Sequence, residues 1–202
     1  MIAGVLLAAG QATRFGAHKL LHPLPDGTPI AVAAARALSS GVDDIIAVVR
    51  ANDAPLIALF EQQRIFIAPF DDAARGMGAS LAYGVNAMPE ATGWLISLAD
   101  MPFVAPGTIA RVADALRRGA PLAAPFCQGR QGHPVGFARE FFTALGALSG
   151  DEGARNLLAA HALRLERVVC NDPGILRDVD TPDDIVVVSS EGMRNVGVRP
   201  SG

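Results

Sequence analysis

The chain has 202 residues, of which 50% are hydrophobic and 18% are charged, and its formal net charge is −3. This length can bury one sizeable core, so we expect a single domain. The weakly acidic balance excludes a general attraction to nucleic acid or anionic membranes, and no apolar run approaches the ~18 residues of a membrane span. No positive charge precedes the first apolar run, as a secretory signal would require, so we expect a cytoplasmic protein without nucleic-acid or membrane partners.

Short apolar runs alternate with longer segments of helical periodicity through the first part of the chain. The short runs, each bounded by turn-forming residues, predict buried strands at 5–9, 45–49, 65–68, 94–99 and 122–126. Apolar residues spaced three and four apart predict helices between them, at 29–40, 53–63, 78–88 and 106–119. This alternation is typical of βαβ units around a mostly parallel sheet.

The pattern changes after residue 126. It predicts a strand at 132–138, helices at 140–148 and 153–161, and a late strand at 163–169. Strands so placed favour some antiparallel pairing. We therefore predict an α/β fold with a mixed, mostly parallel sheet flanked by helices, in a domain spanning 1–188 with a polar tail at 189–202.

Four polar clusters follow predicted strands, at 10–19, 75–80, Asp100 and 178–184. Ligands of open parallel sheets bind in the crevice beyond the carboxyl ends of the strands. We therefore expect the functional site to be assembled from these four clusters.

The loop after the first strand combines small residues with two cations. Ala8, Ala9 and Gly10 let the backbone approach a ligand closely, while Arg14 and Lys19 can bind phosphate oxygens. The spacing fits neither a Walker A loop nor a dinucleotide fingerprint. The residues alone leave two interpretations open: an anion site, or a tight turn that carries two solvated basic residues.

The same loop carries a family resemblance. LAAGQATRFGAHK, from Leu7 to Lys19, resembles the L-A-A-G-x-x-x-R-[MF]-G-x-x-K signature of nucleotidyltransferases. Five further motifs resemble, in the same order, those of the molybdenum cofactor cytidylyltransferase branch: GMGASL at 76–81, LADMP at 98–102, GRQGHPV at 129–135, GDEGAR at 150–155 and DVDTPDD at 178–184.

The resemblance implies a Rossmann-like nucleotide-diphospho-sugar transferase fold and a reaction in which CTP and molybdopterin cofactor give the cytosine dinucleotide form and pyrophosphate. It implies that Arg14 and Lys19 hold the triphosphate and stabilise the transition state, and that the backbone of Leu7–Gly10 holds the nucleotide. A client molybdoenzyme or its chaperone is the implied protein partner.

Acidic residues at two of the clusters suggest a Mg²⁺ site. Asp100 ends an apolar run immediately before Met101-Pro102, so we expect its carboxylate to point into the crevice. Mg²⁺ prefers one or two carboxylates together with phosphate oxygens. The resemblance suggests Asp180, ahead of Asp178, as the second ligand. A lone Asp after a strand can equally form a turn or cap a helix.

Three motifs remain for the base and the acceptor. The resemblance places GMGASL against the nucleobase, with Gly78 and Ser80 as contacts; alternatively, the glycines form a turn and Ser80 caps a helix. It places Arg130 and His133 against the acceptor, where a structural histidine is the other interpretation. The GDEGAR motif either shapes the acceptor pocket or begins a helix.

Three alternative functions stay open. The first is a guanylyltransferase acting on the same cofactor. The second is a nucleotidyltransferase acting on a sugar or polyol phosphate. The third is a non-catalytic protein that delivers the cofactor.

Overall fold

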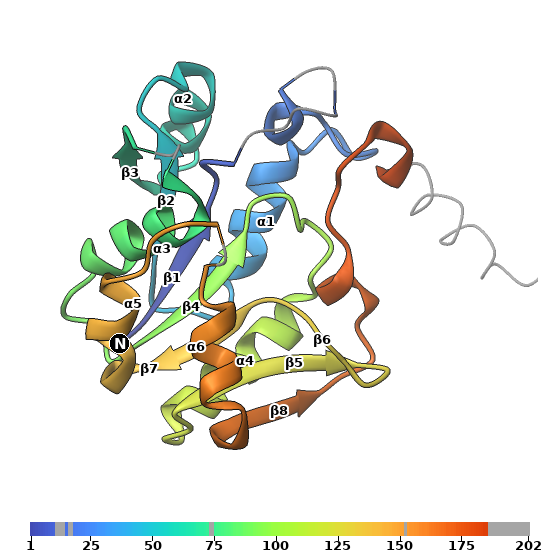
Figure 1. Cartoon of the computed structure of the whole chain (residues 1–202). Coiled ribbons are helices and arrows are strands. Elements are labelled where there is room, and N and C mark those ends of the chain that lie inside the picture. Colours follow the sequence, from blue (N-terminus) through green and yellow to red (C-terminus); the bar gives the residue numbers. More distant parts are fainter. Residues whose placement is uncertain (11–14, 16–17, 73–74, 152, 186–202) are drawn as a thin grey trace, which may run out of the picture.

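The computed structural model describes residues 1–10, 15, 18–72, 75–151 and 153–185. Within these residues the chain forms one eight-stranded sheet, in the order β3-β2-β1-β4-β7-β5-β6 with β8 paired to β5 (Figure 1). The strands are β1 Ile2–Leu7, β2 Asp44–Arg50, β3 Phe66–Phe70, β4 Gly93–Leu98, β5 Leu122–Cys127, β6 Arg130–Gln131, β7 Val135–Ala138 and β8 Leu165–Val169. β1 to β4 are parallel, whereas β7 runs antiparallel to both β4 and β5.

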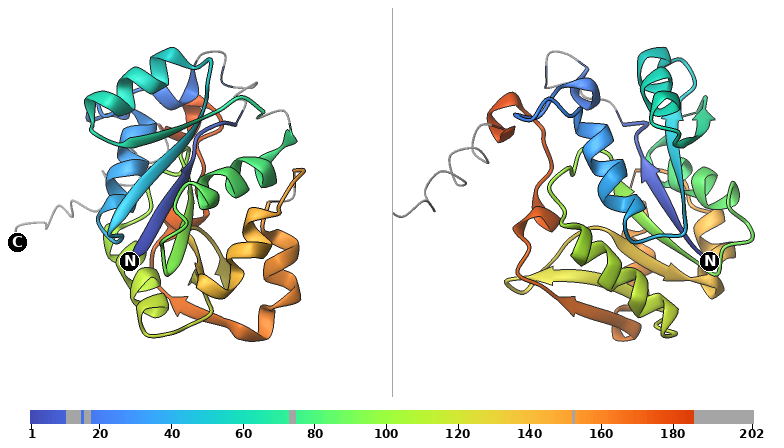
Figure 2. Two further views of the ribbon diagram at one scale, coloured as in Figure 1. Left: turned by 90° about the vertical axis from the view of Figure 1, so that its left-hand side faces the viewer. Right: turned by 180° about the vertical axis from the view of Figure 1, so that it is seen from behind.

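Helices cover both faces of the sheet (Figure 2). The α-helices are α1 Ile30–Ser39, α2 Ala54–Gln62, α3 Met77–Asn86, α4 Pro106–Arg117, α5 Phe142–Gly146 and α6 Arg155–Ala160. Short 3₁₀ turns are η1 Lys19–Leu21, η3 Arg139–Phe141, η4 Ala162–Arg164 and η5 Pro173–Leu176. Among the described residues, we find no helix whose length and apolar content would let it cross a bilayer.

Two buried clusters lie on either side of the sheet. Side chains of α1, α2 and α4 pack into one cluster, and side chains of α3 and α5 pack into the other. Every residue of β1 is buried, because a parallel strand covered on both faces has no solvent side. Gly84 lets α3 lie directly on the sheet, since a Cβ there would overlap Val5 and Val48.

The structure confirms the predicted strands and helices and the mixed, mostly parallel sheet. Most boundaries differ by one to three residues, and the following differences change how a segment is described. β1 ends at Leu7, so that Ala8 and Ala9 belong to the loop; the strand expected at 132–138 begins only at Val135; and the segment 140–148 divides into η3 and α5. The polar tail at 189–202 lies outside the described residues, and the domain limits stay a prediction.

Candidate active site

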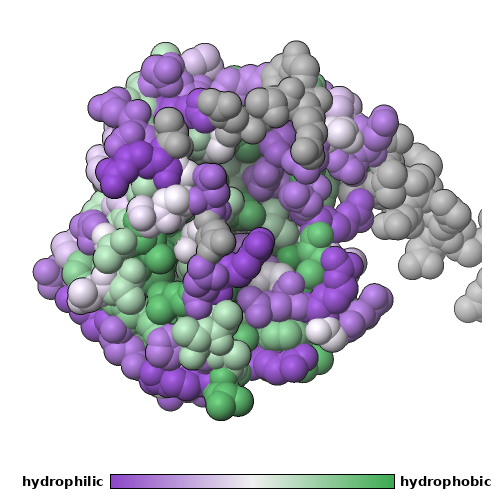
Figure 3. Space-filling view, in the orientation of Figure 1, coloured by the Kyte–Doolittle hydropathy of each residue, from purple (hydrophilic) through white to green (hydrophobic). Residues whose placement is uncertain are grey.

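A cavity of about 620 Å³ opens at the carboxyl ends of β1 and β4. In the space-filling view this region is hollowed, with apolar residues at the bottom of the hollow and mostly hydrophilic residues around it (Figure 3). β1 lies between β2 and β4, which is where the strand order reverses and where ligands of such sheets bind. The cavity is lined by Leu7, Ala8, Ala9, Gly10, Lys19, Leu20, Arg50, Gly76, Met77, Ser80, Leu98, Ala99, Asp100 and Asp151.

The floor of the cavity is the backbone that follows β1. The Ala8 amide donates to the Val48 carbonyl at 2.9 Å, and the Leu7 carbonyl accepts from the Ala99 amide at 3.0 Å. The Arg50 Nε donates to the Ala9 carbonyl at 2.8 Å. Neighbouring elements therefore hold this loop from both sides, which keeps its backbone at a fixed distance from any ligand in the cavity.

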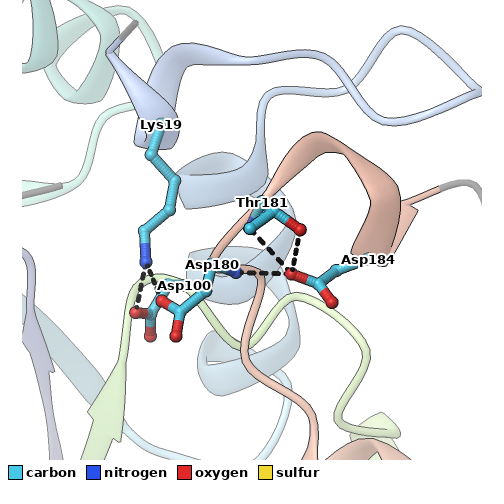
Figure 4. A network of polar contacts seen from close by, with 5 residues as sticks. All are labelled: Lys19, Asp100, Asp180, Thr181 and Asp184. Atoms are coloured by element: carbon cyan, nitrogen blue, oxygen red, sulfur yellow. Dashed lines mark hydrogen bonds and ion pairs between the residues drawn. The ribbon is translucent and has the colours of Figure 1, made fainter. Parts of the chain in front are cut away.

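Lys19 lies between two carboxylates (Figure 4). Its Nζ donates to Asp100 Oδ2 at 2.9 Å and to Asp180 Oδ1 at 3.0 Å, and its side chain is only 10% exposed. Burial alone would lower the pKa of Lys19, but the hydrogen bonds and charges of the two aspartates outweigh burial and raise it above the usual value. The ammonium group is therefore charged throughout the neutral pH range.

Asp180 reaches this position through its own segment of chain. The Val179 amide donates to the Asp100 carbonyl at 2.9 Å, which joins the two acidic segments. Asp184 Oδ2 accepts from the Asp180 amide at 2.9 Å and from the Thr181 amide at 2.7 Å (Figure 4). These bonds lower the pKa of Asp184, with the Thr181 amide as the largest cause. Asp184 lies in a helical segment over residues 182–185.

The donor set at Lys19 fits a hard divalent cation. Asp100 and Asp180 both approach one Nζ, so their carboxylates are close neighbours, and Mg²⁺ takes one or two carboxylates with phosphate oxygens. No group of three or more His, Cys, Asp or Glu side chains in the described part of the chain forms a metal site by itself. Asp100 and Asp180 would leave the remaining positions around such a cation to water and to the ligand's own oxygens.

The predicted acceptor residues lie in different surroundings. The His133 amide donates to the Ile175 carbonyl at 3.0 Å, and its peptide bond to Pro134 is cis. His133 Nδ1 is buried without a hydrogen-bond partner in the described structure. Burial lowers the pKa of His133, although the Ile96 carbonyl and the charges of Asp100 and Asp178 act in the opposite direction. Arg130 is exposed on β6, outside the lining of the cavity.

The two residues predicted to contact the base differ in position, because only one of them lines the cavity. Ser80 is buried within α3 and lines the cavity, so it does not cap this helix; Gly76 occupies the cap, with a φ of 92°. Gly78 is also buried, but its amide donates to the Gly150 carbonyl at 2.7 Å and it does not line the cavity. The glycines of GMGASL therefore pack against the GDEGAR loop.

Other lining residues were not singled out from the sequence. Arg50 ends β2 at the same edge of the sheet as Asp100, so the rule that drew attention to Asp100 could have identified it. Asp151 belongs to a motif that we placed near the acceptor, yet it lines the cavity beside Gly76. Arg14, predicted to be catalytic, lies outside the described residues.

Comparisons with known proteins identify relatives of this chain. Residues 4–167 match the MobA-like NTP transferase domain. The purine catabolism protein PucB of Bacillus subtilis is 34% identical over 197 residues, which cover 92% of this chain and 94% of the relative. The nicotine blue oxidoreductase of Paenarthrobacter nicotinovorans is 29% identical over 192 residues, covering 91% and 94%.

A solved structure extends the comparison. Rv0371c of Mycobacterium tuberculosis superposes with a TM-score of 0.79 at 29% identity, over 93% of this chain and 96% of that one. A complex of Rv0371c with manganese superposes with a TM-score of 0.75 at 27% identity, over 93% and 97%. The chain therefore belongs to the MobA-like NTP transferase family, and it is a nucleotidyltransferase with the nucleotide-diphospho-sugar transferase fold.

Proposed function

We propose that this nucleotidyltransferase joins CMP from CTP to molybdopterin cofactor and releases pyrophosphate. The observation that carries the proposal is the convergence of Lys19, Asp100 and Asp180 at the cavity, which is an arrangement suited to a triphosphate. The choice of CTP and of the pterin acceptor is supported by the six sequence motifs. Four of them, at 7–19, 76–81, 98–102 and 150–155, contribute described residues to the cavity lining, and Asp180 of a fifth pairs with Lys19.

The reaction joins two anions. An oxygen of the acceptor's terminal phosphate bonds to the α-phosphorus of CTP, the bond from that phosphorus to the bridging oxygen breaks, and pyrophosphate leaves with the electron pair. Because both partners repel each other, catalysis depends on positioning and on neutralising negative charge. Lys19 remains protonated, so its Nζ can donate to phosphate oxygens in place of the aspartates.

Asp100 and Asp180 would hold the Mg²⁺ ion that accompanies the triphosphate. Bound there, Mg²⁺ supplies positive charge that offsets the negative charge on the phosphate oxygens. The manganese complex of Rv0371c supports a divalent cation in a protein with this fold. The backbone of Leu7–Gly10, held by Val48, Ala99 and Arg50, keeps the nucleotide in place during the transfer.

The acceptor would approach along the segment that contains Arg130 and His133. Gly132 packs so tightly against the Ile175 carbonyl that no Cβ fits there, and the His133 amide bonds the same carbonyl. This carbonyl belongs to η5, and the chain continues from η5 to Asp178 and Asp180. The GRQGHPV motif is thus joined to the acidic segment, and this link supports an acceptor whose phosphate approaches the α-phosphorus from that side. A client molybdoenzyme or its chaperone would take the product.

The test is pyrophosphate release by purified protein with Mg²⁺, each of the four ribonucleoside triphosphates and molybdenum cofactor. We expect release with CTP only when the cofactor is present, and much slower release by the Lys19→Ala variant. Preference for GTP would establish a guanylyltransferase. Release with a sugar 1-phosphate or polyol phosphate instead of the cofactor would establish another acceptor.

Two further outcomes would contradict the proposal. Cofactor binding without pyrophosphate release for any triphosphate would indicate a delivery protein. Because one relative is named an oxidoreductase, redox turnover of nicotine blue by the same preparation would indicate that different chemistry uses this cavity.

A further inference from the structure

The cavity lies between two walls that come from opposite faces of the sheet. The first wall, which we call the cationic wall after Lys19, consists of Lys19 and Leu20 in η1 together with Asp100 and Asp180, which pair with Lys19. η1 packs against α1 and α2. The second wall, which we call the α3 wall, consists of the start of α3 and the loop beside it: Gly76, Met77, Ser80 and Asp151. α3 packs on the other face of the sheet, together with α5.

Asp151 is held on the α3 wall by the backbone around it. The Gly150 amide donates to the Arg75 carbonyl at 3.0 Å, and the Gly150 carbonyl accepts from the Gly78 amide at 2.7 Å. A Cβ on Gly76 would overlap Asp151 Oδ1, so the carboxylate lies directly against the start of α3. The loop therefore fixes Asp151 at the cavity by two hydrogen bonds that do not involve its side chain.

The carboxylate of Asp151 is exposed, and no hydrogen bond or ion pair of its side chain is found within the described residues. It differs in this respect from Asp100 and Asp180, which are both paired with Lys19. An unpaired carboxylate repels a triphosphate, and it accepts hydrogen bonds without donating any. The part of a nucleotide that faces Asp151 must therefore carry N–H or O–H donors.

The position of the phosphates determines which part of the nucleotide faces Asp151. Lys19 and Asp100 place the triphosphate at the cationic wall, and the base is the end of a nucleotide opposite its phosphates. We propose that Asp151 determines base specificity by accepting a hydrogen bond from the exocyclic amino group of the nucleobase. This inference rests on the proposed nucleotidyl transfer, and it assigns the GDEGAR loop to the nucleotide rather than to the acceptor.

The chemistry of the pyrimidines makes the proposal selective. Cytosine carries an amino donor at the position where uracil carries a carbonyl acceptor. A carboxylate facing that position binds cytosine and repels uracil. Ser80, on the same wall, donates its hydroxyl to the Gly76 carbonyl at a long 3.5 Å. If that bond gives way to a ligand, the hydroxyl can donate or accept, so it does not by itself distinguish the two bases.

The test measures nucleotide affinity without any acceptor, by isothermal titration calorimetry of the full chain with Mg²⁺ and CTP or UTP. The variants are Asp151→Asn, Asp151→Ala and, as a control that removes one exposed acid elsewhere, Glu61→Gln. We expect the preference for CTP over UTP to fall about tenfold or more in both Asp151 variants and to be unchanged in the control. Asp151→Asn should also bind UTP more tightly than the wild type, because its amide can donate to the uracil carbonyl.

An unchanged CTP-to-UTP ratio in both Asp151 variants would overturn the inference. Titration with dCTP provides a second way to overturn it: if Asp151→Ala weakens CTP but not dCTP, the carboxylate binds the ribose 2′-hydroxyl instead. Equal thermal unfolding of all variants is expected, since the side chain of Asp151 makes no hydrogen bond in the described structure.

The same measurement separates this inference from the proposed function. If the wild type binds GTP more tightly than CTP, the proposed use of CTP fails. The role of Asp151 is then tested by comparing the affinities for GTP and for ITP, because ITP lacks the exocyclic amino group of guanine. A fall in the GTP-to-ITP ratio on Asp151→Ala would support the role of Asp151, and an unchanged ratio would overturn it.

Discussion

The two walls of the cavity are built by different means. On the cationic wall, Lys19 is held by charge, through ion pairs with Asp100 and Asp180 that come from distant parts of the chain. On the α3 wall, position is set by backbone hydrogen bonds and by glycines that admit the 149–151 loop. In the function that we propose, the two walls have separate tasks: the wall of paired charges binds the reacting phosphates, and the wall held by backbone contacts selects the nucleotide.

The largest expected effect is that of Lys19→Ala on the cationic wall. Removing one preorganised cation of this kind costs about 2–4 kcal/mol of transition-state stabilisation. We therefore expect kcat, measured as pyrophosphate release at saturating CTP, to fall sharply. Nucleotide affinity should change less. Arg118→Ala, which removes an exposed cation paired with Glu166, is the matched control. Similar kcat values for Lys19→Ala and this control would remove Lys19 from the catalytic machinery.

Asp100→Asn tests the acidic part of the same wall. Loss of one carboxylate weakens the cation site, so the variant should need more Mg²⁺ and should remain slower even at saturating metal. The measurement is a Mg²⁺ titration of initial rate. Asp183→Asn, in the exposed first turn of the helix after Asp180, serves as the control with unchanged metal dependence. Superimposable titrations for the wild type and Asp100→Asn would exclude Asp100 as a metal ligand.

Gly78→Ala tests the α3 wall. A Cβ at this position would lie 2.8 Å from the Ser149 carbonyl oxygen, so the loop that carries Asp151 must move. Overpacking of this kind costs about 1–3 kcal/mol of folding stability. We expect weaker nucleotide binding with kcat largely retained, which is the opposite of the Lys19→Ala pattern. Gly107→Ala in α4, where a Cβ meets nothing within 4 Å, should leave binding unchanged. A loss confined to kcat would show that the two walls do not divide these tasks.

The smallest effect is expected for Asp43→Asn, which lies on neither wall and supplies the reference for stability. Asp43 accepts from the Ile2 amide at 2.6 Å and from Arg117 at 2.9 Å, and these bonds, with the Ile2 amide as the largest cause, lower its pKa below the usual 3.8. A lowered pKa stabilises the fold above pH 3.8, and this contribution disappears as the pH falls through the folded-state pKa.

Urea unfolding at pH 7 and pH 3 measures this contribution. Asp43→Asn should be less stable than the wild type at pH 7 but should lose less stability on acidification, with unchanged kcat and KM at pH 7. Equal losses in the two proteins would indicate that the Asp43 carboxylate gains nothing from its partners in the fold.

The sheet was predictable because its buried strands are short apolar runs with clear boundaries. The position of Asp100 was predictable for a related reason, since a polar residue directly after a buried strand has to lie at the edge of the sheet. The pairing of Lys19 with Asp180 was not predictable from periodicity, because it depends on a non-repetitive segment that is fixed by single hydrogen bonds such as Val179 to Asp100. The contact between Gly78 and Gly150 was not predictable either, because it too depends on a single hydrogen bond to a loop without periodicity.

The bond from the Val179 amide to the Asp100 carbonyl has a consequence for when the protein becomes active during its synthesis. β1 to β4, and with them the floor of the cavity, are complete once residue 98 has been made, and Lys19 by then already lies in the emerged chain. Asp180 is translated only about 80 residues later, at the ~5–20 residues per second typical of ribosomes. The carboxylate pair that we propose holds the metal ion is therefore complete only near the end of translation.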